Sequence, residues 1–441
     1  MQFFDTAGLP ELAAGVARIK ITPPVGVGLA GYFHERIAKR VRDDLFCNVV
    51  VLKESGDPIV IVSLDIIGVY SPVADEAKRL ILAATGIPAA TGIPAANVLL
   101  HATHTHTGPV PTRSHILPHC AEWIEALPGR ILEGVQAALA DLKPAIIIPG
   151  RENVRDAGSV RVCRQKSGKE MFGRTDSIGP AGPCDRELLA LRICDLQGVT
   201  RAFVVNHAMH PDTIGGSRAD FISADWPGEI CKAISQVYGS EVITVFLNGC
   251  CGDINHGIDH PTRRTRSGEA RAISMGRTLA AAAILATEQD EPMAANKIGA
   301  RLEVMPIPYY TRTPEFLAEV EAARKTSEGW NSALVIKNDH WTHDGEIAQV
   351  PVQVLRCGDV MIVGLPGEVF SRWGLELKHW SPAPFTLVVE LANGCFNYIP
   401  TTDQANRGAY GAKPVLSRAL EADAGRKLAD QAQVMLWELW E

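Results

Sequence analysis

Two histidines separated by one residue lie at the end of an apolar run, Val98-Leu-Leu-His-Ala-Thr-His-Thr-His-Thr-Gly-Pro109. Residues two apart on a strand share a face, so a strand over Val98–His106 would point His104 and His106 the same way. Such a pair suits a metal ligand beside a histidine that takes part in catalysis. An isolated His-x-His is as often a polar strand end on the surface, so the motif alone leaves both interpretations open.

A second apolar run also ends in histidines, Phe203-Val-Val-Asn-His-Ala-Met-His-Pro-Asp212. Pro211 restricts His210 to an extended backbone, so its ring would project from a fixed loop. Open α/β sheets place their sites at the carboxyl ends of strands. A lone histidine here is more often structural, but two such strand ends in one chain indicate a shared metal site.

Two later stretches add ligand-type side chains, Gly364-Leu-Pro-Gly-Glu-Val-Phe370 and Ala392-Asn-Gly-Cys-Phe-Asn-Tyr-Ile-Pro-Thr401. Glu368 follows an apolar strand and a Pro-Gly turn, and Tyr398 follows Asn393-Gly394. A glutamate in such a place more commonly faces solvent at a helix N-terminus. Neither residue indicates a metal site by itself.

The elements that must position these residues are strands alternating with helices, which predicts an α/β fold with a mixed β-sheet core covered by helices. Periodicity predicts these strands: Cys47–Leu52, Ile59–Ile67, Val98–His106, Ala145–Pro149, Leu188–Cys194, Ala202–His207, Val242–Leu247, Val350–Leu355, Val360–Leu365 and Thr386–Leu391. It predicts these helices: Ala74–Ala84, Ala121–Leu142, Pro227–Tyr238, Glu269–Thr287, Pro314–Lys325 and Ser417–Trp440.

Composition narrows the class of protein. A hydrophobic fraction of 46% over 441 residues is that of a globular chain with a large core. A net charge of −7 argues against a nucleic-acid-binding surface. No apolar stretch approaches the ~20 residues that span a bilayer, and the N-terminus does not look like a signal peptide. The ten cysteines include no Cys-x-x-Cys pair, which favours free thiols in a cytoplasmic protein. The sequence is compatible with a homo-oligomer and does not decide the oligomeric state.

Taken in order along the chain, these stretches resemble the neutral, non-lysosomal ceramidase family. The matching pieces are Ile19-Lys-Ile-Thr-Pro-Pro24, Gly31-Tyr32, Thr103-His-Thr-His-Thr-Gly-Pro109, His210-Pro211, Ser223-Ala-Asp-Trp-Pro-Gly-Glu229, Gly367-Glu368 and Asn397-Tyr-Ile-Pro-Thr-Thr402. Ordered agreement over most of the chain is more specific than any one short motif.

The resemblance implies a single ceramidase-like zinc hydrolase domain over residues 1–441 that has the fold of the neutral-ceramidase N-terminal domain. It implies a zinc ion held by His104, His210, Glu368 and Tyr398. It also implies catalytic roles for His106, for Tyr410 and for an arginine that polarises the substrate carbonyl. Arg155 is the candidate for that arginine, and Arg164 is its rival.

Such a site would cleave the C–N amide bond of a small N-acyl substrate by attack of a zinc-bound water, whose pKa zinc lowers toward ~7. His106 would either stabilise the oxyanion or protonate the leaving amine, and the sequence does not separate these roles. The same chemistry would allow ester or lactone hydrolysis. A non-catalytic, metal-binding homologue is the third alternative.

The chain departs from the ceramidase pattern in ways that bear on the substrate. Asn255, in Gly249-Cys-Cys-Gly-Asp-Ile-Asn-His256, stands where the family has a serine. The sequence also indicates neither export nor the C-terminal immunoglobulin-like domain of the family, so we expect a small soluble substrate instead of ceramide. Arg263, Arg264 and Arg266 follow Asn255 closely. They form either a solvated basic turn or a cluster that binds a substrate carboxylate.

Overall fold

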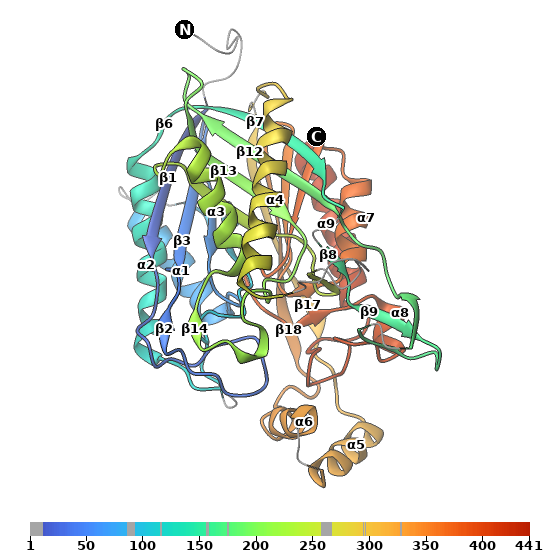
Figure 1. The fold of residues 1–441 in the computed structure, drawn as a ribbon. Coiled ribbons are helices and arrows are strands. Elements are labelled where there is room, and N and C mark those ends of the chain that lie inside the picture. Colours follow the sequence, from blue (N-terminus) through green and yellow to red (C-terminus); the bar gives the residue numbers. More distant parts are fainter. Residues whose placement is uncertain are drawn as a thin grey trace.

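The strands and helices form three mixed β-sheets that surround a shared core (Figure 1). A computed structural model describes residues 12–85, 93–114, 117–155, 158–173, 176–256, 267–293, 295, 297–326 and 329–441. The first sheet has the order β5 (Val98–Ala102), β4 (Ile59–Leu64), β3 (Phe46–Lys53), β1 (Ala13–Lys20) and β6 (Lys143–Pro144). The second has the order β15 (Ile243–Asn248), β13 (Thr200–His207), β12 (Glu187–Cys194) and β7 (Ile146–Asn153). The third has the order β17 (Ile298–Pro308), β18 (Ile347–Cys357), β19 (Val360–Gly364) and β21 (Phe385–Val389).

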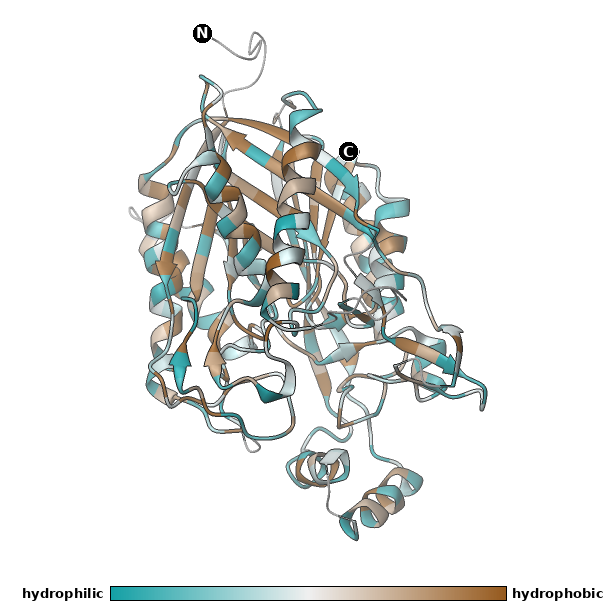
Figure 2. Ribbon diagram, in the orientation of Figure 1, coloured by the Kyte–Doolittle hydropathy of each residue, from teal (hydrophilic) through white to brown (hydrophobic). Residues whose placement is uncertain are grey.

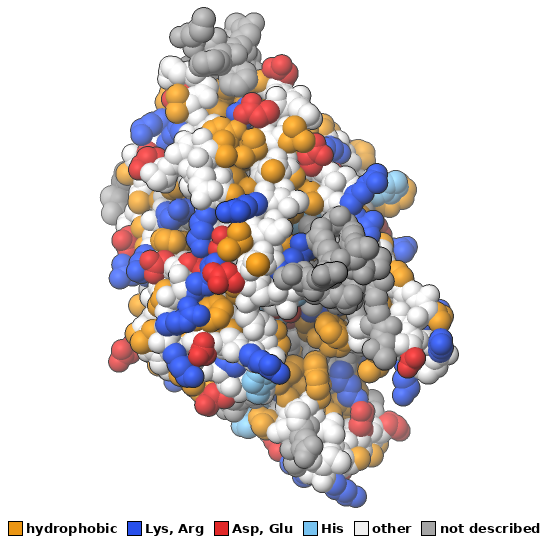
Figure 3. Space-filling model, viewed as in Figure 1, with side chains coloured by type: hydrophobic (Ala, Val, Ile, Leu, Met, Phe, Trp, Pro, Cys, Tyr) orange, Lys and Arg blue, Asp and Glu red, His pale blue; other side chains and the backbone are white. Residues whose placement is uncertain are grey.

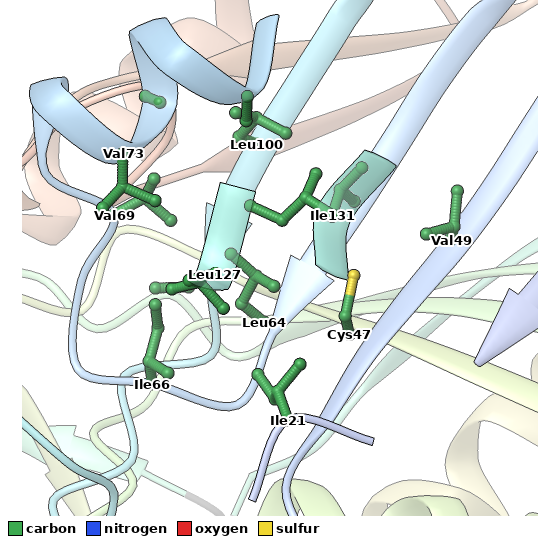
Figure 4. Close-up of a cluster of buried hydrophobic side chains, with 14 of the residues drawn as sticks. Ile21, Cys47, Val49, Leu64, Ile66, Val69, Val73, Leu100, Leu127 and Ile131 are labelled. Atoms are coloured by element: carbon green, nitrogen blue, oxygen red, sulfur yellow. The ribbon is translucent and has the colours of Figure 1, made fainter. Parts of the chain in front are cut away.

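A pair of helices covers the outer side of each sheet (Figure 1). The pairs are α1 (Ser71–Thr85) with α2 (Ala121–Ala140), α3 (Asp225–Tyr238) with α4 (Glu269–Glu288), and α7 (Ser371–Trp380) with α9 (Ala424–Trp440). Strand side chains alternate between the two faces: Val49 and Val51 pack beneath α1 and α2, whereas Val50 and Leu52 enter the core that the three sheets share. Figure 2 shows largely hydrophobic strands beneath helices of mixed character, and Figure 4 shows Ile131 of α2 within the outer cluster of the first sheet.

The same order of strands and helices occurs in all three sheets. It divides most of the chain into three units, 13–140, 146–288 and 298–440. In each unit the first and second strands are antiparallel, as are the second and third. The third and fourth strands are parallel and joined through a helix, and a second helix follows.

A glycine on the first strand of each unit contacts the end of that second helix. A Cβ there would meet the helix in the pairs Gly15–Ala138, Gly150–Ala286 and Gly299–Leu439. The repeated arrangement places the carboxyl ends of three parallel strand pairs at one end of the molecule.

Smaller elements complete the chain. They are β2 (Arg40–Val41), β8 (Gly158–Val160), β9 (Val162–Gln165), β10 (Glu170–Phe172), β11 (Ser177–Pro180), β14 (Phe221–Ile222), β16 (Ile254–His256), β20 (Glu368–Val369), β22 (Tyr398–Ile399), α8 (Thr402–Asn406) and the short 3-10 helices Ala95–Asn97 and Gly216–Arg218. The hairpin of α5 (Pro314–Arg324) and α6 (Gly329–Asp339) projects from the body below the sheets in Figure 1.

The predicted α/β class is confirmed, and so is most of the strand pattern. One prediction that bears on the site is wrong: β5 ends at Ala102, so His104 and His106 lie in a loop and not on a strand. The polar Thr103–Thr107 segment leaves the sheet, and His104 adopts a left-handed φ of 74°. No helix within the described ranges is long and apolar enough to cross a bilayer. All ten cysteines are free thiols.

Candidate metal centre

Loops from all three units meet at the lower end of the sheets in Figure 1. His104 follows β5 of the first unit, His210 follows β13 of the second, and Glu368 follows β19 of the third. The Nε2 atom of His104 lies 3.1 Å from Nε2 of His210 and 3.5 Å from Oε2 of Glu368. The Glu368 oxygen lies 3.3 Å from Nε2 of His210. Each unit therefore contributes one side chain to the same point.

Backbone carbonyls fix the two imidazoles. Nδ1 of His104 donates to the carbonyl of Ile67 at 2.7 Å, and Nδ1 of His210 donates to the carbonyl of Cys251 at 2.9 Å. A carbonyl only accepts hydrogen bonds, so the proton of each neutral ring sits on Nδ1 and the lone pair on Nε2. A guanidinium nitrogen of Arg161 lies 2.9 Å from Nε2 of His210 as well.

Two imidazole lone pairs that face each other across 3.1 Å form no hydrogen bond with one another and call for a cation between them. The neighbouring carboxyl group also fits a bound cation. Oε2 of Glu368 points to the same place: it is buried without a hydrogen-bond partner among the described residues and lies 3.5 Å from Nε2 of His104 and 3.3 Å from Nε2 of His210. Histidine nitrogens with one carboxylate are the donor set of catalytic zinc sites, and Nδ1 bonds to backbone carbonyls are typical of ligating histidines. The residues present therefore fit zinc.

His106 is held differently from the other two rings. Its Nε2 lies 3.3 Å from Nε2 of His104, and one nitrogen from each of the three histidines lies within 4.8 Å of the other two. Its Nδ1 is buried and has no hydrogen-bond partner among the described residues. Gly31, in the left-handed region at φ 101°, passes so close that a Cβ would collide with the His106 ring. Packing and not a carbonyl anchor thus orients His106.

Arg161, which sequence reasoning missed, is the buried arginine at the centre. It donates to the carbonyl of Gly252 and to the Tyr398 hydroxyl, each at 2.8 Å, and lies 3.9 Å from the Glu368 carboxylate. The candidate Arg155 is exposed on the loop after β7. Its rival Arg164 is half-exposed and pairs with Glu170 at 3.1 Å. The signal in the sequence was a single charge between apolar neighbours, Val160-Arg161-Val162, which the structure places at the junction of β8 and β9.

The two tyrosines of the predicted site lie beside Arg161. Tyr398 is the register partner of Glu368 in the β20–β22 pair, and its ring centroid lies 5.5 Å from the guanidinium carbon. The Tyr410 ring lies 5.2 Å from the same carbon and 6.2 Å from the Tyr398 ring. Tyr398 thus bonds directly to Arg161, and the Tyr410 ring packs against the same guanidinium.

Asn255 lies at the edge of the centre on β16. Its Nδ2 is 3.5 Å from a carboxylate oxygen of Asp212, which also pairs with Nε2 of His256 at 2.8 Å. Burial acts to raise the pKa of Asp212, but the ion pair with His256 holds it well below its usual range. Asn255 therefore lies beside an ionised carboxylate two residues after His210. Arg263, Arg264 and Arg266 lie outside the described residues.

The fold and the centre together define an α/β protein of three helix-covered sheets with a buried histidine and carboxylate site. Among solved structures, the chain resembles neutral ceramidase from Pseudomonas aeruginosa, with a TM-score of 0.76 at 17% sequence identity over 98% of this chain and 74% of that one. A ceramidase complexed with C2 gives the same TM-score and identity, with 98% of this chain and 76% of that chain covered. No model of a known protein family matches the chain. The comparison confirms the neutral-ceramidase fold that the sequence motifs predicted.

Proposed function

We propose that the protein is a zinc-dependent hydrolase that cleaves the C–N amide bond of an N-acyl substrate. The observation that carries the proposal is the pair of imidazole lone pairs of His104 and His210, which meet the carboxyl group of Glu368 beside a buried guanidinium. Zinc, when bound, supplies Lewis acidity and a water nucleophile of lowered pKa. The remaining steps fall to the protein.

Arg161 is placed to stabilise the negative charge that develops on the carbonyl oxygen. Burial acts to lower its pKa, but Tyr398, Tyr410 and Glu368 raise it above its ordinary value, so the guanidinium stays charged. Its bonds to Gly252 and Tyr398 hold it in place before substrate arrives, and such fixed donors stabilise an oxyanion most effectively. We therefore give the carbonyl-polarising role to Arg161 in place of Arg155.

His106 is the candidate for proton transfer to the leaving amine. Burial and the neighbouring His104 hold its pKa well below the ordinary value, so the ring is neutral with one nitrogen protonated. His104 and His210 are each anchored through Nδ1 to a carbonyl and His106 is not. Its proton can therefore sit on either nitrogen, as proton transfer requires.

A row of aromatic side chains extends away from Arg161, starting at Tyr410, and favours a substrate with an apolar group. The Tyr410 ring centroid lies 5.2 Å from that of Phe172 and 5.9 Å from that of Trp330, and Trp330 lies 4.9 Å from Phe33. These residues come from four separate segments, and Trp330 lies in α6, the second helix of the projecting hairpin. Figure 3 shows hydrophobic side chains in the recess between the hairpin and the body. An acyl chain or ring flanking the amide would gain burial there.

The test is turnover of a panel of N-acyl amino acids, simple amides and the matching esters by purified protein of measured zinc content. Hydrolysis of amides that depends on zinc supports the proposal. Turnover of esters alone would assign ester hydrolysis, and bound zinc without turnover of any member would indicate a non-catalytic metal-binding protein.

A further inference from the structure

Glu390 follows β21 at the same end of the third sheet and is fully buried. Its Oε1 accepts a hydrogen bond from the Cys251 thiol at 2.9 Å. Its Oε2 accepts two more, from the backbone N–H groups of Cys251 and Val369, each at 2.9 Å. A buried carboxyl thus joins the loop after β15 to the loop after β19.

Both of those loops carry parts of the metal centre. The Cys251 carbonyl accepts from Nδ1 of His210 and so sets which nitrogen of that ring faces the metal. Val369 directly follows Glu368, and its carbonyl accepts from the N–H of Gly252 at 2.9 Å. The Gly252 carbonyl in turn accepts from Arg161. The Gly252–Val369 bond runs between the same two segments that Glu390 joins, and the other two contacts share residues with the first of them.

We propose that Glu390 is a positioning residue that tunes zinc affinity by fixing Cys251 against His210 and Val369 beside Glu368. The inference rests on the proposed zinc site. Without the carboxyl, two buried backbone N–H groups lose their acceptor, and the loops must move to satisfy them. A small shift of the Cys251 carbonyl releases the His210 ring, and groups that orient a ligating histidine typically change metal affinity ~10–100-fold.

Glutamine at this position separates positioning from packing. In Glu390→Gln the amide oxygen can accept from both N–H groups, and the amide nitrogen faces the Cys251 sulfur, a weak acceptor. Glu390→Leu fills similar space and accepts nothing. Ile131→Ala is the matched control, because it removes packing from the outer cluster of the first sheet without touching either loop.

The experiment measures the zinc dissociation constant of each holoprotein by competition with a chelator, together with the visible spectrum of the Co²⁺-substituted protein. We expect Glu390→Leu to bind zinc ~10–100-fold more weakly with an altered Co²⁺ spectrum. Glu390→Gln should bind zinc with a dissociation constant within ~3-fold of the native value. Ile131→Ala should lower the melting temperature alone.

Native zinc affinity in Glu390→Leu, or an equal loss in the Gln and Leu variants, would overturn the inference. If Glu390→Leu does not fold, Glu390→Asp, which withdraws the carboxyl by one methylene, makes the same comparison with the same two outcomes. A native protein that binds no zinc would overturn the proposed function and this inference together. Tight native binding without amide turnover would remove only the proposed activity.

Discussion

The rings of His104 and His210 stand perpendicular, at an interplanar angle of 90° with centroids 4.6 Å apart, and their Nε2 atoms face each other. Each ring is fixed through Nδ1 by a carbonyl from a neighbouring loop of its own unit. Neither can rotate away without breaking a buried hydrogen bond. The site is therefore preorganised for a metal ion.

We predict about one zinc per chain, as a mononuclear site of this kind implies. His104→Ala and His210→Ala should each lose metal and activity together, because each removes a fixed donor. The matched control is His207→Ala, which removes a buried histidine of β13 that contacts the Glu187 carbonyl, and it should keep its zinc. Zinc content by atomic absorption measures the effect, and full occupancy in the double variant of His104 and His210 would refute the ligand assignment.

His106→Ala should lower kcat by ~10²–10³-fold, the usual cost of losing one catalytic donor or acid, while most of the zinc stays bound. The reason is that His106 lies beside the centre without the carbonyl anchor of the other two rings. Zinc content and kcat are measured on the same preparation. Metal loss equal to that of His104→Ala would make His106 a ligand.

Arg161→Gln should reduce kcat by ~10²–10³-fold through loss of oxyanion stabilisation. Arg161→Lys should recover little, since an ammonium cannot reproduce the fork that reaches Gly252, Tyr398 and His210. The exposed Arg155→Gln is the control and should leave kcat and KM unchanged. A larger loss of kcat in Arg155→Gln than in Arg161→Gln would instead assign the carbonyl-polarising role to Arg155.

Trp330 should contribute to recognition of an apolar group. Trp330→Ala should raise KM for long-chain or aromatic N-acyl substrates more than for N-acetyl ones, because burial of apolar surface is lost. Trp437→Ala is the control, as Trp437 on α9 is 49% exposed and Trp330 is 50% exposed. Equal effects of the two variants, or equal effects on short and long acyl groups, would contradict a role for Trp330.

We expect soluble N-acyl substrates to have a higher kcat/KM than detergent-dispersed ceramide. We expect this because the motif resemblance places Asn255 where the ceramidase pattern has a serine, and the Asn255 amide lies 3.5 Å from Asp212. Ceramide turnover near ~10⁴ M⁻¹s⁻¹, the low end for ordinary enzymes, would refute this expectation. Charge-removing variants of Arg263, Arg264 and Arg266, measured on anionic and neutral amides, test the proposed carboxylate cluster.

Much of the fold follows from the sequence, because aliphatic runs of strand length recur between amphipathic helices. The strand β13 was predicted within two residues of its bounds. The strands β1 and β17, the first strands of the first and third units, were missed. The helix α9 begins at Ala424, seven residues after the predicted Ser417, because the chain before it pairs with other loops instead of coiling.

The candidate site was less accessible to sequence reasoning. Its ligand-type residues stand out as histidines in apolar surroundings, whereas Arg161 and Glu390 are common residue types whose roles depend on burial. Glu390 follows an apolar strand without any motif. Contacts between loops more than a hundred residues apart, such as Cys251 with Glu390, leave no local pattern in either segment.

The threefold repetition of the sheets has a consequence for cooperativity. Each unit supplies one candidate donor to the centre, so a bound ion would add a further tie between segments that already meet through packing and through hydrogen bonds such as that of Cys251 to Glu390. Local opening of any one unit would then release the ion, and the free energy of binding opposes that opening in all three. Metal binding would thus stabilise all three units together, and the opening of one unit would weaken the other two.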